Sequence, residues 1–215
     1  MEKTTRGSPV LPEQNNTAMA AGIIKEAPRE MVKNHGVLMY KGNLHIPKPD
    51  GKTDYCIPYQ IRADMLKRAH IGAHLLFQGE FRTRNDKSSG KLQLKVYFHI
   101  KTILPSSSEE CINDVCIVGY LCSEPYFKNK KTERGIMALT SADIAVHRPE
   151  KVSDYIPCSF YGSLAYMMKT ARVSSKYLIY GRMVNRNYFC HGEQRTAYEL
   201  QVYRADLLEE PELLH

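Results

Sequence analysis

The sequence predicts an all-β protein with short helices, built as two tandem five-stranded barrels. Two observations lead to this prediction. One pattern of apolar segments and turns occurs twice, at residues 15–104 and 112–208, and each copy contains five strand-like segments. The repeated unit is far longer than that of a solenoid, so each copy is expected to be a domain with its own modest core. The chain is therefore expected to act through two linked modules.

Three stretches of the first copy recur in the second copy in the same order. They are Ala20–Pro28 with Ile117–Pro125, Asp54–Pro58 with Asp154–Pro157, and Leu75–Asn85 with Tyr177–Asn187. The offset grows from 97 residues between Gly22 and Gly119 to 102 residues between Gly79 and Gly181. This drift is expected if the two copies differ mainly in the lengths of their loops.

Each copy has the order of three strands, one short helix and two more strands. In the first copy the pattern predicts strands at 17–25, 36–46, 54–61, 73–84 and 91–103, with a helix at 63–70. In the second copy it predicts strands at 114–122, 135–146, 154–161, 176–189 and 195–204, with a helix at 164–171. The polar stretches 26–34 and 123–134 are expected to be loops. This order is that of an OB-fold, which binds oligonucleotides or oligosaccharides on its strands 2 and 3 and on its loops.

Three segments lie outside the two copies. Residues 1–14 are expected to form a flexible N-terminal arm, 105–111 a polar linker, and 209–215 a short acidic C-terminal end. The N-terminus lacks the apolar core of a secretory signal, and no run approaches the roughly 18 apolar residues that span a bilayer. We therefore expect a cytoplasmic, nucleoid-associated protein.

Charge and composition favour a binding protein over an enzyme. The net charge is +7 and the pI is about 9.0, which favours a polyanionic partner, although a merely basic protein is the alternative. The six cysteines have no close zinc spacing, and Cys56 and Cys158 lie in apolar strand-like runs, so buried free thiols are expected. The eight histidines are scattered and no phosphate-loop motif occurs. We expect no catalytic residues, no metal and no cofactor.

Strand alternation places an aromatic and basic strip on the outer face of the second copy. The residues expected to point inward are Ile156, Cys158, Phe160, Ile179 and Met183. The residues expected to form the outer strip are Tyr155, Tyr161, Tyr188, Arg182 and Arg186. Tyrosine rings stack on unpaired bases for about 1–3 kcal/mol each, and arginines contact phosphates. The alternative is that the tyrosines are ordinary packing residues of half-buried strands.

The polar stretch of the second copy adds further candidates for phosphate contact. Tyr126 and Phe127 precede the basic run Lys128–Arg134, in which Lys128 and Lys130 are the first two lysines. The alternative is a solvated loop without a ligand. The corresponding stretch of the first copy is more sparsely basic.

These segments resemble a known family. Tyr177–Tyr188 resembles the fourth-strand signature of bacterial single-stranded DNA-binding proteins, and Gly79–Arg84 matches the same signature in the first copy. Asp154–Ala165 resembles the family's third strand and the start of its helix, and Asn113–Leu121 resembles its opening strand. The resemblance spans nearly all of both copies and is more specific in the second.

The resemblance implies which residues stack on bases. In the second copy they are Tyr155, Tyr161 and Tyr188, where tryptophan or phenylalanine is common in the family. In the first copy, Tyr55 fits the first position, Ile61 or Arg62 the second, and Asp86 the third. The cations that accompany them in the first copy are Arg82 and Arg84. The first copy is therefore expected to bind more weakly or to serve in assembly.

The expected function is sequence-independent, non-enzymatic binding of single-stranded DNA that protects it in replication, recombination or repair. By the resemblance, the chain is expected to form a homodimer with four OB-folds and to meet replication or recombination proteins. By the resemblance, partner enzymes are recruited through a long linker and an acidic tip, and the acidic end 209–215 follows the last strand without such a linker. Two alternatives stay open. One is a primosome or recombination accessory protein that mainly binds protein partners, and the other is an RNA-binding OB module.

Overall fold

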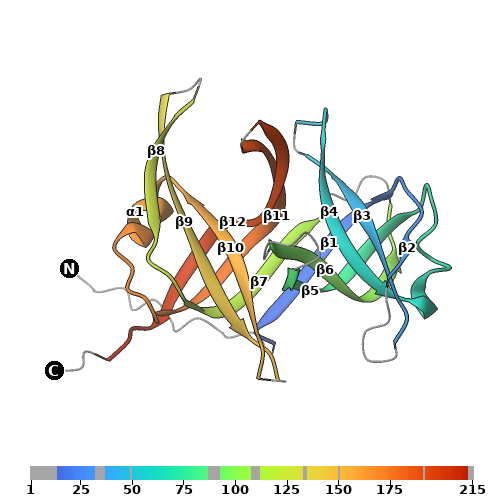
Figure 1. Cartoon of the computed structure of the whole chain (residues 1–215), viewed down its shortest axis with the longest axis horizontal. Coiled ribbons are helices and arrows are strands. Elements are labelled where there is room, and N and C mark those ends of the chain that lie inside the picture. Colours follow the sequence, from blue (N-terminus) through green and yellow to red (C-terminus); the bar gives the residue numbers. More distant parts are fainter. Residues whose placement is uncertain are drawn as a thin grey trace, which may run out of the picture.

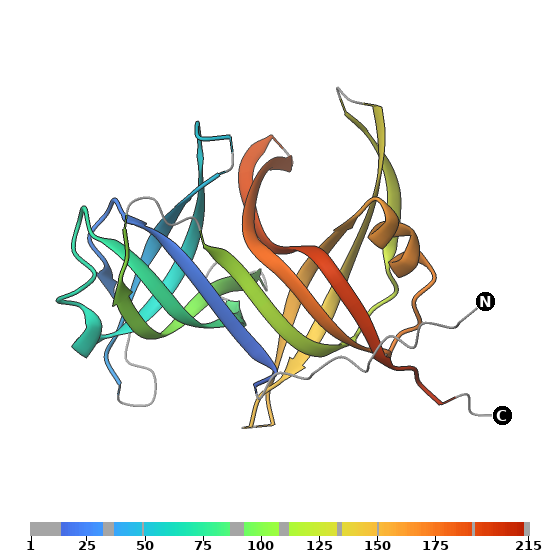
Figure 2. The same ribbon diagram turned by 180° about the vertical axis from the view of Figure 1, so that it is seen from behind.

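The protein consists of two small β-barrels that lie side by side (Figures 1 and 2). The computed structural model describes residues 14–31, 37–48, 50–86, 93–107, 112–132, 135–149, 151–190 and 192–212. The first barrel contains β1 (Asn16–Ile24), β2 (Arg29–Glu30), β3 (Met39–Pro47), β4 (Asp54–Arg62), the 3₁₀ turn η1 (Ala63–Met65), β5 (His74–Asp86) and β6 (Gln93–Pro105). The second contains β7 (Asn113–Leu121), β8 (Tyr126–Thr132), β9 (Gly135–His147), β10 (Ser153–Tyr161), α1 (Ser163–Lys169), β11 (Lys176–Cys190) and β12 (Glu193–Glu209).

Both barrels close in the same strand order. In the first barrel the ring runs β1-β3-β4-β6-β5 and returns to β1, and in the second it runs β7-β9-β10-β12-β11 and returns to β7. The β4–β6 and β10–β12 pairs are parallel, and the other pairs are antiparallel. This is the topology of the OB-fold, so the predicted fold class of two tandem five-stranded barrels is confirmed.

The two barrels share one continuous sheet. Strands β1 and β7 pair antiparallel from Asn16–Ile117 to Ala20–Asn113, with Ala18 opposite Val115 at the centre. Both central residues are buried. Because Ala18 and Val115 hold equivalent positions in the two copies and face each other at the centre of this antiparallel ladder, the two barrels are related by an approximate two-fold axis.

The interior of each barrel is filled by the inward face of its strands. In the first barrel Tyr59, Phe77 and Phe98 pack edge to face, with ring centroids 5.2 and 6.4 Å apart. In the second barrel the predicted inward residues are all buried, which confirms the alternation: Ile156, Cys158, Phe160, Ile179 and Met183. Burial of each large apolar side chain stabilises the fold by about 1.5–3 kcal/mol.

Two glycines permit the bends that close the barrels. The strand register shifts at Gly79 between β5 and β6 and at Gly181 between β11 and β12. A Cβ atom at Gly79 would lie 2.0 Å from the carbonyl oxygen of His99, and one at Gly181 would lie 2.7 Å from that of Gln201. Only glycine allows the backbones to approach so closely at these bulges.

Two predictions about the local structure were wrong. The stretches 26–34 and 123–134 are not loops throughout, because they contain β2 and β8, and β8 forms a hairpin with β9. The helix predicted at 63–70 is only the 3₁₀ turn η1, which buries none of its residues. The matching helix α1 buries Ala165 and Met168, and this apolar contact supports a full helix.

Parts of three predicted segments lie outside the described residues. These parts are residues 1–13 of the arm, 108–111 of the linker and 213–215 of the acidic end. The segment boundaries stay predictions. None of the helices in the described ranges is long and apolar enough to cross a membrane.

Candidate nucleic-acid interface

One cluster of predicted site residues lies along β10, β11 and β12. Arg186 places its guanidinium carbon 5.6 Å from the ring centroid of Tyr188, which is 37% exposed. A guanidinium nitrogen of Arg186 also lies 3.8 Å from the Glu199 carboxylate. Burial, and then Glu199, raise the pKa of the half-buried Tyr161. Tyr161, Arg186, Tyr188 and Glu199 thus form one group, which we call the Tyr188 cluster.

Tyr155 lies apart from this cluster, where the second barrel meets the first. Its side chain is 47% exposed. Its backbone N–H donates to the hydroxyl of Thr83 on β5, at 2.9 Å. A strand of the first barrel therefore fixes the backbone of an exposed aromatic residue of the second.

The β8–β9 hairpin carries a second group of aromatic and basic side chains, which we call the basic hairpin (Figure 1). Tyr126 is 64% exposed, and the Lys128 ammonium lies 5.8 Å from its ring centroid. Because β8 is a strand, Tyr126, Lys128 and Lys130 share one face. The predicted basic loop is therefore an ordered ribbon that projects from the barrel.

The other face of the basic hairpin contacts α1. The Phe127 ring lies 5.4 Å from the Tyr166 ring, and the Lys169 ammonium lies 4.7 Å from the Phe127 centroid. Tyr166 is 57% exposed. Sequence reasoning missed Tyr166 and Lys169 as candidate site residues. Their spacing of three on a helix was the available signal, because it places an aromatic and a cation on one face.

The first barrel has fewer free groups for a ligand. Arg82 is engaged by Glu80, and Arg62 by Asp64. Arg84 is exposed on β5. Two of these three arginines are therefore paired with carboxylates, and Arg84 is the exposed one.

The strand register shows that the sequence-based assignment of equivalent residues in the two barrels needs a correction. The ladders of β3 with β4 and of β9 with β10 place Cys56 at the position of Tyr155, and Arg62 at that of Tyr161. The match of Tyr55 with Tyr155 is therefore wrong by one residue, because the buried faces of β4 and β10 align only with that shift. Neither first-barrel position carries an aromatic ring.

Arg182 and Tyr55 come together from opposite barrels, away from the Tyr188 cluster. Both line a cavity of about 450 Å³ between the barrels. The Lys48 ammonium lies 5.0 Å from the Tyr55 ring centroid. The predicted outer strip is therefore divided between the Tyr188 cluster, Tyr155 and this cavity.

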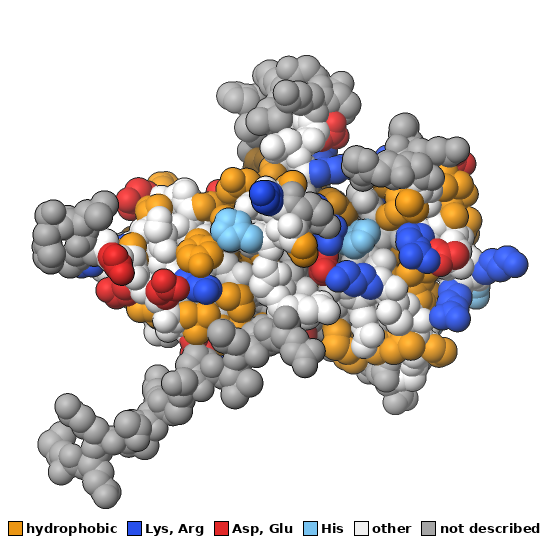
Figure 3. Space-filling model, turned by 90° about the horizontal axis from the view of Figure 1, so that it is seen from below, with side chains coloured by type: hydrophobic (Ala, Val, Ile, Leu, Met, Phe, Trp, Pro, Cys, Tyr) orange, Lys and Arg blue, Asp and Glu red, His pale blue; other side chains and the backbone are white. Residues whose placement is uncertain are grey.

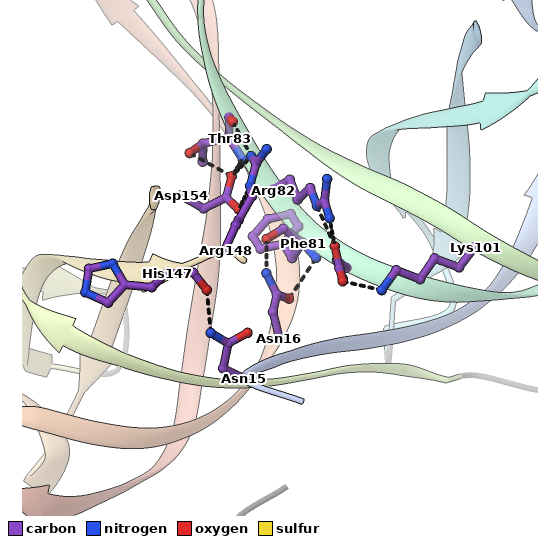
Figure 4. Close-up of polar contacts among 10 residues, drawn as sticks. Asn15, Asn16, Phe81, Arg82, Thr83, Lys101, His147, Arg148 and Asp154 are labelled. Carbon is purple, nitrogen blue, oxygen red and sulfur yellow. Dashed lines mark hydrogen bonds and ion pairs between the residues drawn. The ribbon is translucent and has the colours of Figure 1, made fainter. Parts of the chain in front are cut away.

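A network of ion pairs and hydrogen bonds holds the barrels together on the other side (Figure 4). Asp154 is 1% exposed and pairs with Arg148, whose Nε donates at 2.6 Å. The backbone N–H of Thr83 also donates to Asp154, at 2.7 Å, and Arg148 donates to the Thr83 carbonyl at 3.2 Å. Donors from Arg148 and Thr83 thus satisfy a buried carboxylate, which fixes the relative orientation of the barrels.

Charge is uneven over the surface. Seen from below, Lys and Arg side chains gather over the first barrel, on the right, whereas acidic side chains are more prominent over the second barrel (Figure 3). This face of the second barrel is a poor surface for a polyanion. In the part of the chain that the structure describes, no three His, Cys, Asp or Glu side chains are grouped to hold a metal ion.

Comparison with known proteins agrees with this architecture. The chain is similar to the wild-type single-stranded DNA binding protein from Thermus aquaticus, with a TM-score of 0.69 and 16% identity over 93% of this chain and 96% of that chain. A deletion mutant of the Thermus aquaticus protein gives a TM-score of 0.66 and 18% identity over 93% of this chain and 98% of that chain. No curated protein matches the chain.

At these identities the two structures show a shared fold. A more specific relation comes from the sequence, because residues 112–208 match the model described as the single-strand binding protein family. This range contains the Tyr188 cluster, Tyr155 and the basic hairpin. The second barrel is thus the part of this chain that matches the single-strand binding protein family.

Proposed function

We propose that the chain binds single-stranded DNA without sequence preference and without catalysis, and that it protects exposed strands during replication, recombination or repair. The observation that carries this proposal is the set of exposed tyrosines, two of them beside cations, on the barrel that matches the family. Tyr126, Tyr155 and Tyr188 present rings on which bases stack for about 1–3 kcal/mol each. Stacking accepts every base, so the binding is broad.

Cations next to these rings supply phosphate contacts. Arg186 is held against Tyr188, and Lys128 lies near Tyr126. A phosphate on Arg186 competes with Glu199, which is 3.8 Å away. Because phosphate contacts release counterions from the strand, affinity falls as salt rises.

The first barrel binds more weakly in this proposal. Cys56 and Arg62 take the places of two second-barrel tyrosines, and Asp86 takes that of Tyr188. A carboxylate at the last position repels phosphate. This asymmetry also supports a second candidate function, in which the chain is an accessory protein that mainly holds a protein partner.

We propose that the chain forms a homodimer with four OB-folds. The support is the outer face of the shared sheet. Met19 lies between the buried Ala18 and Ala20, and Leu104 follows the buried Ile103, so both point outward. They are 37% and 39% exposed. A second copy that covered this face would bury them.

The test is a fluorescence titration with dT oligomers of increasing length, monitored through tyrosine. The proposal predicts saturable binding without ATP or metal, with affinity that decreases with salt. A flat curve at low ionic strength contradicts it. Competition with U oligomers of the same length distinguishes DNA from RNA binding. Capture of a helicase or recombinase with only weak dT binding would favour the accessory function.

A further inference from the structure

The approximate two-fold axis creates two equivalent junctions between the barrels. In one junction, the β9–β10 hairpin of the second barrel lies against β1, β5 and β6 of the first. In the other, the β3–β4 hairpin of the first barrel lies against β7, β11 and β12 of the second. The backbones meet in the same way. The Tyr155 N–H donates to the Thr83 side chain at 2.9 Å, and the Cys56 N–H donates to the Asn185 side chain at 2.9 Å. The side chains around these two hydrogen bonds are different.

One junction is filled by ion pairs, and we call it the paired junction (Figure 4). Arg148 pairs with the buried Asp154. Glu80 pairs with both Arg82 and Lys101. Each of the three cations named here is engaged by a carboxylate, so an added anion would have to compete with Asp154 or Glu80.

The other junction has different chemistry at the same positions, and we call it the open junction. The strand ladders and the two bulges show which residues of the two junctions are equivalent. The pairs, with the residue of the paired junction first, are Arg148 and Lys48, Asp154 and Tyr55, Glu80 and Arg182, and Lys101 and Tyr203. Both carboxylates are therefore replaced, one by an aromatic ring and one by a cation.

The open junction contains the cavity of about 450 Å³, a size typical of small-ligand sites. Its lining residues are Ile46, Pro47, Lys48, Tyr55, Asn113, Asp114, Arg182 and Tyr203. Its one lining carboxylate, Asp114, accepts a hydrogen bond from the Tyr203 hydroxyl at 3.2 Å. Burial, and then Asp114, raise the pKa of Tyr203 to about 12, so this hydroxyl stays a donor at neutral pH.

Arg182, which lines this cavity, has an unsatisfied donor. Its Nε is shielded from solvent and has no hydrogen-bond partner in the described structure. A buried donor without a partner is destabilising. Because guanidinium groups bind phosphate through paired N–H donors, a phosphate in the cavity is a suitable ligand for Arg182. The Lys48 ammonium, held over Tyr55, adds a second positive charge on the opposite wall.

We propose that the open junction binds one nucleotide of a single strand as the strand passes from the second barrel to the first. Arg182 and Lys48 contact its phosphate, and Tyr203, which is 53% exposed, packs against its base or sugar. This inference rests on the proposed function and adds a path to it. The strand crosses between barrels at the open junction only, because the cations of the paired junction are engaged by Asp154 and Glu80.

The test compares matched variants of the two junctions with short and long dT oligomers. Each OB-fold occupies about 4–16 nucleotides, so an oligomer of about 10 stays on the second barrel and one of about 35 reaches both. Arg182→Gln is expected to weaken binding of the long oligomer about tenfold. The salt slope is the slope of the logarithm of the binding constant against the logarithm of the salt concentration. Its magnitude should fall by about 0.7 in this variant, the value for one lost phosphate contact on a single strand. Binding of the short oligomer should not change.

Two controls keep the result interpretable. Lys101→Gln, the matched change in the paired junction, should leave the long-oligomer salt slope unchanged. Lys48→Gln changes the cation that the first barrel contributes to the cavity lining, and it should repeat the effect of Arg182→Gln, which guards against a folding defect in the latter. Circular dichroism and thermal unfolding check that each variant is folded.

The outcomes separate this inference from the proposed function. If the wild-type chain binds both oligomers and neither open-junction variant affects the long one, the crossing site is wrong while DNA binding stands. If the wild-type chain binds neither oligomer, the proposed function fails as well. Titration with dTMP tests a free nucleotide as the source of the phosphate. Saturable dTMP binding that Arg182→Gln abolishes, with unchanged long-oligomer affinity, would overturn the strand path.

Discussion

The two barrels hold their first and fourth strands together with the same pair of hydrogen bonds. The Asn16 side chain donates to the Phe81 carbonyl at 2.8 Å and accepts from the Phe81 N–H at 3.0 Å. The Asn113 side chain does the same with Met183, at 2.8 and 2.9 Å. Both barrels also have a glycine at the bulge of the fourth strand. The parts that close the barrel are therefore alike in the two units.

The outward side chains are not alike. Tyr155, Tyr161 and Tyr188 of the second barrel correspond to Cys56, Arg62 and Asp86 of the first. The basic hairpin of the second barrel has only the two-residue β2 as its counterpart. The inward-facing and bulge residues therefore determine the fold. The outward-facing residues differ between the two barrels, and they determine which ligand groups each barrel can contact.

The largest expected effect is on stability at the paired junction. Asp154→Ala removes a buried carboxylate and leaves Arg148 without its partner, so it should lower the free energy of unfolding by about 3–5 kcal/mol. Tyr55→Ala is the matched change in the open junction and should cost about 1–2 kcal/mol. Urea denaturation measures both. Equal losses would show that the two junctions do not differ as described.

The next effect concerns stacking. Tyr155→Ala with Tyr188→Ala should weaken dT binding by about 3 kcal/mol, because each ring contributes about 1–3 kcal/mol. The first-barrel change Tyr55→Ala should cost less. Fluorescence anisotropy with a labelled dT oligomer measures both variants. An unchanged affinity of the double variant would show that the assigned surface is wrong.

The first barrel should also show a pH-dependent stability that the second lacks. Burial lowers the pKa of His99 to about 4, with further lowering by Arg82, Lys101 and Arg148 against an opposing effect of Glu80. The unfolded histidine, with a pKa near 6.5, binds more protons between pH 6.5 and 4. Stability from this group is therefore present above pH 6.5 and is lost as pH falls to 4, by about 2 kcal/mol after discounting for its partial exposure.

The second barrel has Gln201 at the position of His99. His99→Gln makes the first barrel resemble it and should remove this part of the pH dependence. Urea denaturation at pH 7 and pH 5 measures the change. A variant that loses as much stability as the wild-type chain between these values would contradict the assignment.

The smallest effect is expected at the basic hairpin. Lys128→Gln with Lys130→Gln should reduce affinity by about 1 kcal/mol and lower the salt slope by about 1.4, the value for two phosphate contacts. Arg29→Gln on the short β2 of the first barrel is the matched control and should change neither. Titrations at several salt concentrations measure both variants. If the double variant has the same salt slope as the wild-type chain, these lysines lie outside the interface.

Much of the fold could be predicted because strand alternation is a local signal. The alternation in β10 predicts that Ile156, Cys158 and Phe160 are buried, and they are. The strand β8 could not be predicted, because its run of lysines has no apolar alternation. Its hydrogen bonds to β9 hold it in place instead.

The site was predicted less completely because it depends on contacts between the barrels. Arg148 was not singled out, since its role comes from Asp154 and from Thr83 of the other barrel. The position of Arg182 opposite Tyr55 follows from the pairing of β1 with β7, which no local pattern indicates. Residue types on strands were predictable, but their assembly across the two-fold axis was not.

The central claim is that the second barrel carries the main contacts to a single strand. Ultraviolet crosslinking of dT oligomers to the intact chain, followed by mapping of the modified peptides, tests it most directly. The account predicts adducts in β8, β10 and β11, at Tyr126, Tyr155 and Tyr188. Adducts confined to the first barrel, or to the outer face of the shared sheet around Met19, would contradict it.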